Sequence, residues 1–478
     1  MHTAYVRELK PYSLAALASE FAMNLNDALK IIGDLMVNGI IRYHLDTTLN
    51  DGNNSDEEKE AKPNEKYQFV FVGMVIIHDL VLISYPKYFR NRKPTDEELR
   101  QIFRLLKRNA DKTSICRVSE DGKQTNDKLS IMLALLDLYA EYGVYSNFVE
   151  GRELNGTGVT DWNRTIGNHL PILIGNRPIY IEYETYKTFQ NEADYITRLH
   201  RAVLTECSQE LFKANVGDLL SFDEICLSDE NVDDLGDAET LEWRLENEHS
   251  SQFIDWKIMA LNLLKRYLLA RENTTELDEI NAFGTTSFFN IWERACKVAF
   301  GDVLNSRLDD LGLPLVGDWN KLAYQTLLKI IPQPKWERYV HGRYNYCGAS
   351  ATLIPDTISF TYNNKGEYVF CIYDAKYYVP SESGEMKYQP GLESVTKQFL
   401  YQSAYESFIK DYKFDTVVNA FLVPTAEKEM YQIGRVSFTE VMGEVERPLS
   451  NFVTMWALPA NQIFNAYLNG EQIDKVGV

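Results

Sequence analysis

Two aspartates and a lysine interrupt a strand-like stretch, IPDTISFTYNNKGEYVFCIYDAKYY, which spans residues 354–378. Asp356 lies at the start of the first apolar run, and Asp374 lies two residues before Lys376 in the second. The turn-forming residues 363–366, NNKG, predict that the two runs pair as a hairpin, which would bring Asp356 near Asp374. Because side chains alternate along a strand, Asp374 and Lys376 should share one face. The sequence therefore predicts that two carboxylates and an ammonium group meet at one end of a hairpin.

This set of groups is suited to the hydrolysis of a phosphodiester. Two carboxylates a few ångströms apart repel each other unless a cation lies between them. Oxygen ligands favour a hard ion such as Mg²⁺, with Mn²⁺ as a substitute, and Mg²⁺ commonly takes one or two carboxylates plus a substrate phosphate. A lysine beside the ion can orient or deprotonate water and offset charge on the phosphate. The alternative is an ion pair on an edge strand, with an unrelated aspartate in a turn.

The order of these residues is the signature of the PD-(D/E)XK nuclease fold. It reads Pro355-Asp356, a gap, and then Asp374-Ala375-Lys376. Nucleases of this fold often hold a further acid on the preceding helix. Glu293, in NIWERACKVAF, lies one position from an apolar stripe and is a candidate for that acid and for a third metal ligand. The alternative is that Glu293 is a surface residue with no role in the site.

The helix expected after the hairpin carries two candidate glutamines. Gln398, Gln402 and Tyr405 fall at i, i+4 and i+7 and therefore on one face. Polar amides among apolar neighbours suggest a glutamine aimed at the active site or at the DNA backbone. A solvated helix face is the alternative, and which glutamine acts is left open.

Composition and charge limit the classes of function. The 478 residues carry a formal net charge of −20, which argues against strong DNA binding by the chain alone and suits work inside a complex. Six cysteines have no CxxC spacing, which argues against a zinc ribbon or a disulfide framework. The N-terminus has no apolar signal core and no phosphate loop is found, so we expect a soluble, cytoplasmic protein without a membrane partner or its own nucleotide site.

The pattern of elements predicts an α/β chain of several domains, α+β in its arrangement. We expect a winged-helix-like unit plus an acidic disordered loop at 1–66, a β/helical region for partner or DNA contact at 67–250, and a nuclease domain with a mixed central sheet flanked by helices at 251–478. A small helical packing module is an equal alternative for the first unit. A hairpin should turn near His78, and helices are predicted at 95–109, 127–142, 192–214, 251–271, 286–307 and 391–412.

Several blocks resemble known proteins. IYDAKYY followed by LYQSAYE is similar to the nuclease subunit of McrBC, and FVGMVIIHDLVLISYPKYF is similar to a hairpin near the start of McrC chains. GVTDWNRTI, PIYIEYETYKT, DYITRLHRAVLTEC and TTSFFNIWERACKVAFGD resemble blocks of the LlaJI-type restriction endonuclease family. One departure is that Gln402 and Tyr405 form Q-x-x-Y, where McrC-like helices usually have Q-x-x-x-Y.

The resemblance implies a type II-like restriction system in phage defence. This chain would cut double-stranded DNA, a separate McrB-like AAA+ GTPase would recognise the site, and a DNA methyltransferase would accompany them. The alternatives are a degenerate nuclease-fold adaptor that stimulates a partner NTPase, and a winged-helix regulator. Two other sets of residues are interpreted as structural. The loop residues could contact DNA or the partner, but loop packing is favoured for them, and a helical histidine is more often structural than a ligand; these are Asp161, Trp162, Arg164 and His169 in the loop, and His200 in the helix.

Overall fold

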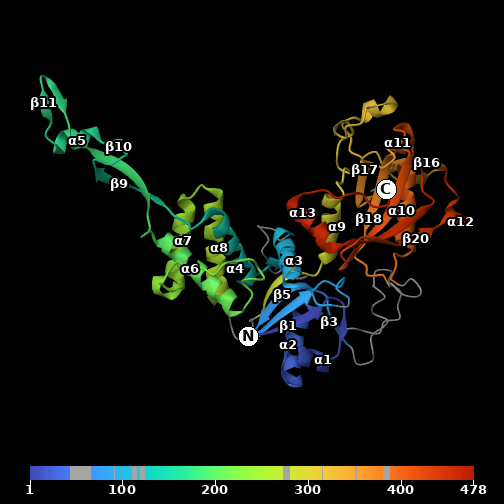
Figure 1. Ribbon diagram of the computed structural model, residues 1–478, viewed down its shortest axis with the longest axis horizontal. Coiled ribbons are helices and arrows are strands. Elements are labelled where there is room, and N and C mark those ends of the chain that lie inside the picture. Colours follow the sequence, from blue (N-terminus) through green and yellow to red (C-terminus); the bar gives the residue numbers. More distant parts are fainter. Residues whose placement is uncertain are drawn as a thin grey trace. The chain divides into compact units, whose positions relative to one another are not determined.

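The computed structural model describes residues 1–43, 66–90, 92–109, 116–118, 124–126, 128–272, 280–314, 316–349, 352–380 and 388–478. The chain divides into two compact units, one of residues 111–283 together with Met1, and one of residues 2–110 and 284–478. Helices and several separate sheets occur along the chain (Figure 1), which confirms the prediction of a mixed α/β protein. The predicted boundaries at residues 66 and 250 stay a prediction, and most of the predicted acidic loop, up to residue 65, lies outside the described residues.

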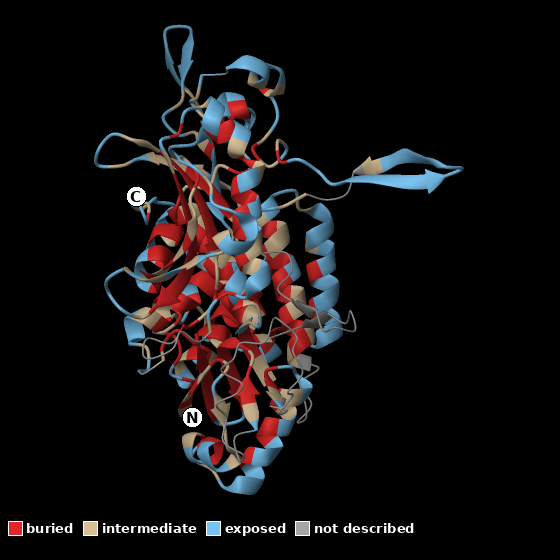
Figure 2. Cartoon of the chain, turned by 90° about the vertical axis from the view of Figure 1, so that its right-hand side faces the viewer, coloured by how far each residue is buried: buried red, intermediate tan, exposed pale blue. Residues whose placement is uncertain are grey.

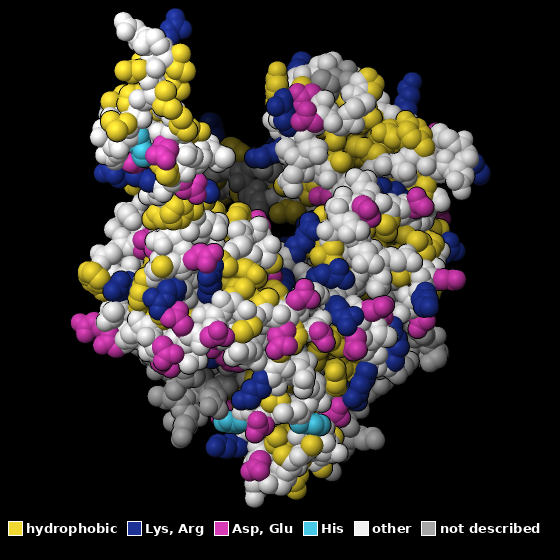
Figure 3. Space-filling model, turned by 60° about the vertical axis from the view of Figure 1, so that its left-hand side comes forward, with side chains coloured by type: hydrophobic (Ala, Val, Ile, Leu, Met, Phe, Trp, Pro, Cys, Tyr) yellow, Lys and Arg dark blue, Asp and Glu magenta, His cyan; other side chains and the backbone are white. Residues whose placement is uncertain are grey.

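The unit of residues 111–283 is built on packed helices and carries a long β-arm (Figure 1). The four longest helices are α4 (Lys128–Tyr142), α6 (Tyr195–Lys213), α7 (Ala238–Ser251) and α8 (Asp255–Glu272). The arm contains β9 (Phe148–Leu154), β10 (Val159–Thr160), α5 (Trp162–Asn168), β11 (Ile172–Ile174), β12 (Arg177–Ile179) and β13 (Glu184–Gln190). β13 pairs antiparallel with both β9 and β10. Apolar side chains gather on this arm (Figure 3) and are exposed there, among them Phe148, Trp162, Leu170 and Leu173.

Two polar residues of this unit have the structural roles that the sequence favours. His200 is fully buried, and its Nδ1 accepts a hydrogen bond of 2.9 Å from the backbone N–H of Tyr145. Burial lowers the pKa of His200 to about 4, so the imidazole stays neutral and can act as that acceptor. Asp161 caps helix α5 by accepting from the N–H of Arg164, and it also accepts from the hydroxyl of Tyr186.

The N-terminal part of the other unit begins with two small sheets and three helices. The first sheet has the order β2-β4-β3 and lies with helices α1 (Leu14–Glu20) and α2 (Leu25–Val37), which the side chains of Ser13 and Asn24 cap. Its strands are β2 (Pro11–Tyr12), β3 (Ile41–Tyr43) and β4 (Tyr67–Phe69).

In the second sheet, β1 (His2–Arg7), β6 (Leu80–Tyr85) and β5 (Val72–Ile77) are neighbours, and helix α3 (Asp96–Asn109) follows. The predicted hairpin is confirmed, since β5 and β6 are joined at His78, whose φ is 50°.

The C-terminal part of that unit is a five-stranded mixed sheet of order β17-β18-β19-β21-β20. Its strands are β17 (Thr357–Tyr362), β18 (Tyr368–Ala375), β19 (Thr416–Thr425), β20 (Tyr431–Ser437) and β21 (Phe452–Pro459). The β18–β19 and β19–β21 pairs are parallel, whereas the outer pairs are antiparallel. Helices α9 (Phe288–Ala299) and α13 (Ala460–Asn469) pack against each other, and α10 (Leu392–Ala404) and α11 (Glu406–Asp411) connect the central strands β18 and β19. A short helix, α12 (Thr439–Met442), follows β20.

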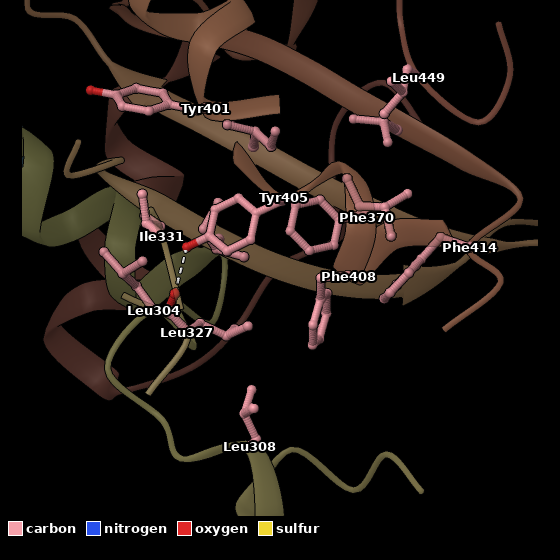
Figure 4. Close-up of a cluster of buried hydrophobic side chains, with 14 residues drawn as sticks. Leu304, Leu308, Leu327, Ile331, Phe370, Tyr401, Tyr405, Phe408, Phe414 and Leu449 are labelled. Atoms are coloured by element: carbon pink, nitrogen blue, oxygen red, sulfur yellow. Dashed lines mark hydrogen bonds between the residues drawn. The ribbon is translucent and has the colours of Figure 1, made fainter. Parts of the chain in front are cut away.

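Two predicted helices differ in extent from the observed ones. The helix expected over 286–307 ends at Ala299, because Gly301 adopts a left-handed φ of 61° directly afterwards. The helix expected over 391–412 is divided at Tyr405 into α10 and α11. There the Tyr405 hydroxyl donates to the carbonyl of Leu327 at 3.0 Å, inside an apolar cluster that includes Phe370 and Phe408 (Figure 4). Among the described residues, every helix is too short or too polar to span a membrane.

Candidate active site

The β17–β18 hairpin brings the predicted aspartates and lysine together. Thr357 pairs with Tyr373, so the residues that adjoin this pair, Asp356 and Asp374, lie at the same end of the hairpin. The backbone N–H of Ala375 donates to Asp356 Oδ2 at 3.0 Å, and Lys376 Nζ lies 2.7 Å from Asp374 Oδ2. The expected juxtaposition of Asp356, Asp374 and Lys376 is therefore present.

The turn of the hairpin explains why the strands pair in this register. The Asn363 side-chain oxygen accepts from the backbone N–H groups of Lys365 and Glu367, both at 2.9 Å. Gly366 has a φ of 78°, a conformation that suits glycine. The local sequence thus sets the register, and the register places the carboxylates.

Burial and neighbouring charges act on the protonation of these groups. Burial raises the pKa of Asp356 well above its ordinary value, and the negative charges of Asp374 and Glu293 raise it further. Burial alone would lower the pKa of Lys376, but the adjoining carboxylate of Asp374 outweighs it and the net pKa is raised. Lys376 therefore carries a charge, and Asp356 favours either a proton or a second cation.

The donor set fits a hard divalent ion held by few protein ligands. Mg²⁺ commonly uses one or two carboxylates and completes its shell with water and substrate phosphate. Asp356 and Asp374 supply such a pair. The pKa of Asp356 is raised by burial and by the negative charges of its neighbours, and a bound cation would offset that excess of negative charge. Within the described ranges, no group of three or more His, Cys, Asp and Glu side chains is placed to hold a metal. The site therefore offers two carboxylates and does not form a closed protein cage.

Glu293 lies on the neighbouring helix α9, where its charge acts on Asp356 without joining the pair. Its carboxylate lies 2.6 Å from Lys297 Nζ, one helical turn later. Burial raises the pKa of Cys296, and the charges of Asp356 and Glu293 raise it further, which indicates that this thiol lies near both carboxylates. Glu293 is thus part of the electrostatic surroundings of the site, although Lys297 holds its side chain.

The two candidate glutamines on α10 have different surroundings. Gln402 is clamped to Ser450, since its Nε2 donates to the Ser450 carbonyl at 3.0 Å and its Oε1 accepts from the Ser450 N–H at 2.9 Å. Gln398 is fully buried, and in the described part of the chain neither Nε2 nor Oε1 of its side chain has a hydrogen-bond partner. A buried amide without partners is costly unless something else binds it. Of the two glutamines, Gln398 is therefore the one whose side-chain amide is not already hydrogen-bonded to described residues.

Two tyrosines near the site carry roles that sequence reasoning missed. Tyr401 donates from its hydroxyl to the carbonyl of Ile354 at 3.0 Å, which holds α10 against the segment that leads into Asp356. Tyr377, next to Lys376, donates to Glu8 Oε2 at 2.6 Å. Tyr401 lies one helical turn after Gln398 and directly before Gln402, so its place on the helix face of Gln398 could have been found from the sequence.

Glu8 ties the N-terminal sheet to the strand of the candidate site. Its Oε2 also accepts from the backbone N–H of Lys87 at 3.1 Å, and the Lys87 ammonium lies 4.9 Å from the Tyr377 ring centroid. Glu8 and Tyr377 are 369 residues apart in sequence. No local pattern in the sequence could predict this contact.

Comparison with known proteins identifies the family. The model of the LlaJI restriction endonuclease family matches residues 71–446, which is most of the chain. The chain belongs to the LlaJI restriction endonuclease family. This confirms the resemblance found in the sequence, and the match includes Asp356, Asp374 and Lys376.

One curated relative and two solved structures are similar to this LlaJI family member. The relative is the type II restriction enzyme BsuMI component YdjA of Bacillus subtilis (strain 168), 26% identical over 420 residues, or 84% of this chain and 81% of that protein. A half-complex from a tetradecameric assembly of Thermococcus gammatolerans McrB AAA+ hexamers with bound McrC matches 98% of this chain and 99% of its own chain, at 14% identity and a TM-score of 0.35. The Thermococcus gammatolerans McrBC complex matches 62% and 86%, at 13% identity and a TM-score of 0.24.

Proposed function

We propose that this chain is the DNA-cleaving subunit of a restriction system and hydrolyses phosphodiester bonds with Mg²⁺. The observation that carries the proposal is the meeting of Asp356, Asp374 and Lys376 at the end of the β17–β18 hairpin. Membership of the LlaJI restriction endonuclease family supports the same class of reaction. The five-stranded mixed sheet with helices α9 and α10 is, in this proposal, a PD-(D/E)XK nuclease domain.

Each residue of the site has a role that follows from its surroundings. Asp356 and Asp374 would hold the ion, which when bound supplies a Lewis acid and a more acidic water. The Ala375 N–H fixes the orientation of Asp356. Lys376, charged because of Asp374, would donate to a phosphate oxygen and offset the charge that develops there. Gln398 would orient water or substrate with its available amide, and Gln402 would hold α10 to Ser450.

Glu293 would act from the edge of the site. Its charge already favours a cation beside Asp356. If the Lys297 ion pair opened, the Glu293 carboxylate would become a further hydrogen-bond acceptor at the edge of the site. In this proposal, Glu293 tunes the site and is not one of its two metal-binding carboxylates.

A partner would bring the subunit to its DNA. The formal charge of −20 disfavours strong DNA binding by the chain as a whole. The McrC-like blocks in the sequence favour an McrB-like AAA+ GTPase as that partner, with a DNA methyltransferase in the same system. The exposed apolar side chains of the arm around β9 and β13 are suited to a protein contact.

Cleavage by variants of the full chain, assayed with its AAA+ partner, Mg²⁺ and double-stranded DNA, tests the proposal. Asp374→Ala and Lys376→Ala should each abolish cleavage while leaving partner binding intact. Two exposed controls remove the same charges elsewhere: Asp318→Ala, and Lys365→Ala in the turn of the same hairpin. The controls should retain cleavage. Full activity of either site variant would refute the assignment, and a wild-type complex that never cuts with Mg²⁺ or Mn²⁺ would favour the adaptor role.

A further inference from the structure

Another hairpin of the unit that contains the candidate site, β15 (Lys335–Val340) and β16 (Arg343–Ala349), is exposed from Lys335 to Cys347. It projects as a pale blue arm in Figure 2. Its aromatic side chains do not pack into a core, since Trp336 is 65% exposed and Tyr344 is 70% exposed. Large aromatic side chains on a projecting hairpin indicate a binding surface.

The charge of this hairpin is opposite to that of the chain. Residues 335–349 contain Lys335, Arg338 and Arg343 against one acid, Glu337, in a chain with a net charge of −20. Val340 pairs with Arg343, and Arg338 lies two residues before Val340, so both arginines lie on one face. The hairpin therefore presents a cationic face.

The opposite face carries tyrosines. Tyr339 pairs with Tyr344, with ring centroids 5.0 Å apart, and Tyr346 lies two residues further along β16. A two-residue turn of His341 and Gly342, with φ of 49° and 81°, joins the strands. Such a turn matches the twist of paired strands, and the pairing continues from it up to a register shift between Trp336 and Glu337. On the cationic face, the exposed Trp336 lies two residues before Arg338, so this face combines two arginines with a flat aromatic ring. This combination is suited to nucleic acid, because arginine binds phosphates and aromatic rings contact sugars and bases.

The base of the hairpin leads directly to the candidate active site. Thr352 Oγ1 donates to the carbonyl of Pro332 at 2.8 Å and closes that base. Asp356 follows Thr352 by four residues, which span at most about 14 Å even when fully extended. Tyr401 fixes the connecting segment through Ile354. A duplex whose phosphate lies at Asp356 would therefore extend past the base of this hairpin.

We propose that the β15–β16 hairpin, residues 335–349, is a DNA-binding arm that holds the duplex beside the bond to be cut. Arg338 and Arg343 would contact the DNA backbone. This inference rests on the proposed nuclease function. The arm gives an acidic chain a local cationic surface where its site needs one. Arginine and aromatic residues also occur in protein interfaces, so a protein partner is the rival occupant.

Salt-dependent binding of the full chain to a fluorescein-labelled DNA duplex, measured with its AAA+ partner present, tests the arm. Arg338→Gln/Arg343→Gln should lower affinity and reduce the slope of log K against log salt by about 2, because each lost phosphate contact contributes about 0.9. Arg104→Gln/Lys410→Gln removes two exposed cations from helices α3 and α11 and should leave the slope unchanged. An unchanged slope and affinity in the arm variant would overturn the proposal.

Photo-crosslinking identifies the occupant. With p-benzoylphenylalanine introduced at Trp336, on the same face as Arg338, crosslinks to labelled DNA support the proposal, whereas crosslinks to the partner protein without DNA overturn it. The two proposals fail separately. Normal cleavage and DNA binding by the arginine variant would refute the DNA-binding role of the hairpin alone. DNA crosslinking by the complex with p-benzoylphenylalanine at Trp336, together with a wild-type complex that never cuts DNA, would refute the nuclease function alone.

Discussion

Gln398 and Gln402 lie one turn apart on α10, yet their replacement by methionine should have opposite effects on stability. Gln402→Met would remove two hydrogen bonds and leave the Ser450 N–H and carbonyl without their partner. A buried polar group left unsatisfied costs about 1–3 kcal/mol. Because Ser450 is only half-buried, we expect its two groups together to cost about 2–3 kcal/mol in the free energy of unfolding, near the lower end of that range. Gln398 forms no such bonds with described residues, and its buried amide is itself a cost. Gln398→Met should leave stability unchanged or raise it by about 1–2 kcal/mol.

Chemical denaturation followed by circular dichroism, with DNA cleavage measured in parallel, separates the two roles. Gln402→Met should show a lower denaturation midpoint, and its cleavage should recover when the assay temperature is lowered. Gln398→Met should show an unchanged or raised midpoint and lose cleavage at every temperature. Methionine matches glutamine in length, so neither variant opens a large cavity. Equal losses of stability in the two variants would refute this division of roles.

Three further predictions concern the same unit. In metal-free buffer, the folded state keeps a proton on Asp356 that the unfolded chain releases, so stability should fall as pH rises from about 4 toward the raised folded pKa. Asp356→Asn should flatten this fall in a pH series of unfolding midpoints. An unchanged slope in the variant would contradict the prediction. Tyr377→Phe removes the hydrogen bond to Glu8 and should cost about 1–3 kcal/mol, which thermal unfolding would detect; a wild-type melting temperature would argue against the contact. Phe370→Ala should cost about 3–5 kcal/mol in denaturant, because the ring is fully buried in the cluster of Figure 4, and a loss under 1 kcal/mol would show that the cluster is loosely packed.

The parts of the site that depend on local sequence could be predicted. Asp356, Asp374 and Lys376 lie within 21 residues of one another, and the NNKG turn alone fixes which residues face each other. The caps at Ser13 and Asn24 and the turn at His78 are equally local. Short-range sequence patterns were therefore sufficient to predict the carboxylate pair and the positions of most helices and strands.

The remainder depends on contacts between distant parts of the chain. Gln402 binds Ser450 across 48 residues, and nothing on the helix face distinguishes this clamped amide from that of Gln398. Tyr405, where the predicted helix is interrupted, likewise bonds to Leu327, 78 residues earlier. Helical periodicity treats these positions alike, because only tertiary packing decides which polar group finds a partner.

The central claim is that Asp356 and Asp374 together bind a hard divalent ion. Crystals of the full chain soaked with Mn²⁺ allow a direct measurement, because Mn²⁺ substitutes for Mg²⁺ and gives an anomalous signal. We expect one anomalous-difference peak in contact with both carboxylates, and its loss in Asp374→Ala crystals. A Mn²⁺ peak elsewhere, with the Asp356–Asp374 pair empty at saturating metal and neutral pH, would contradict it.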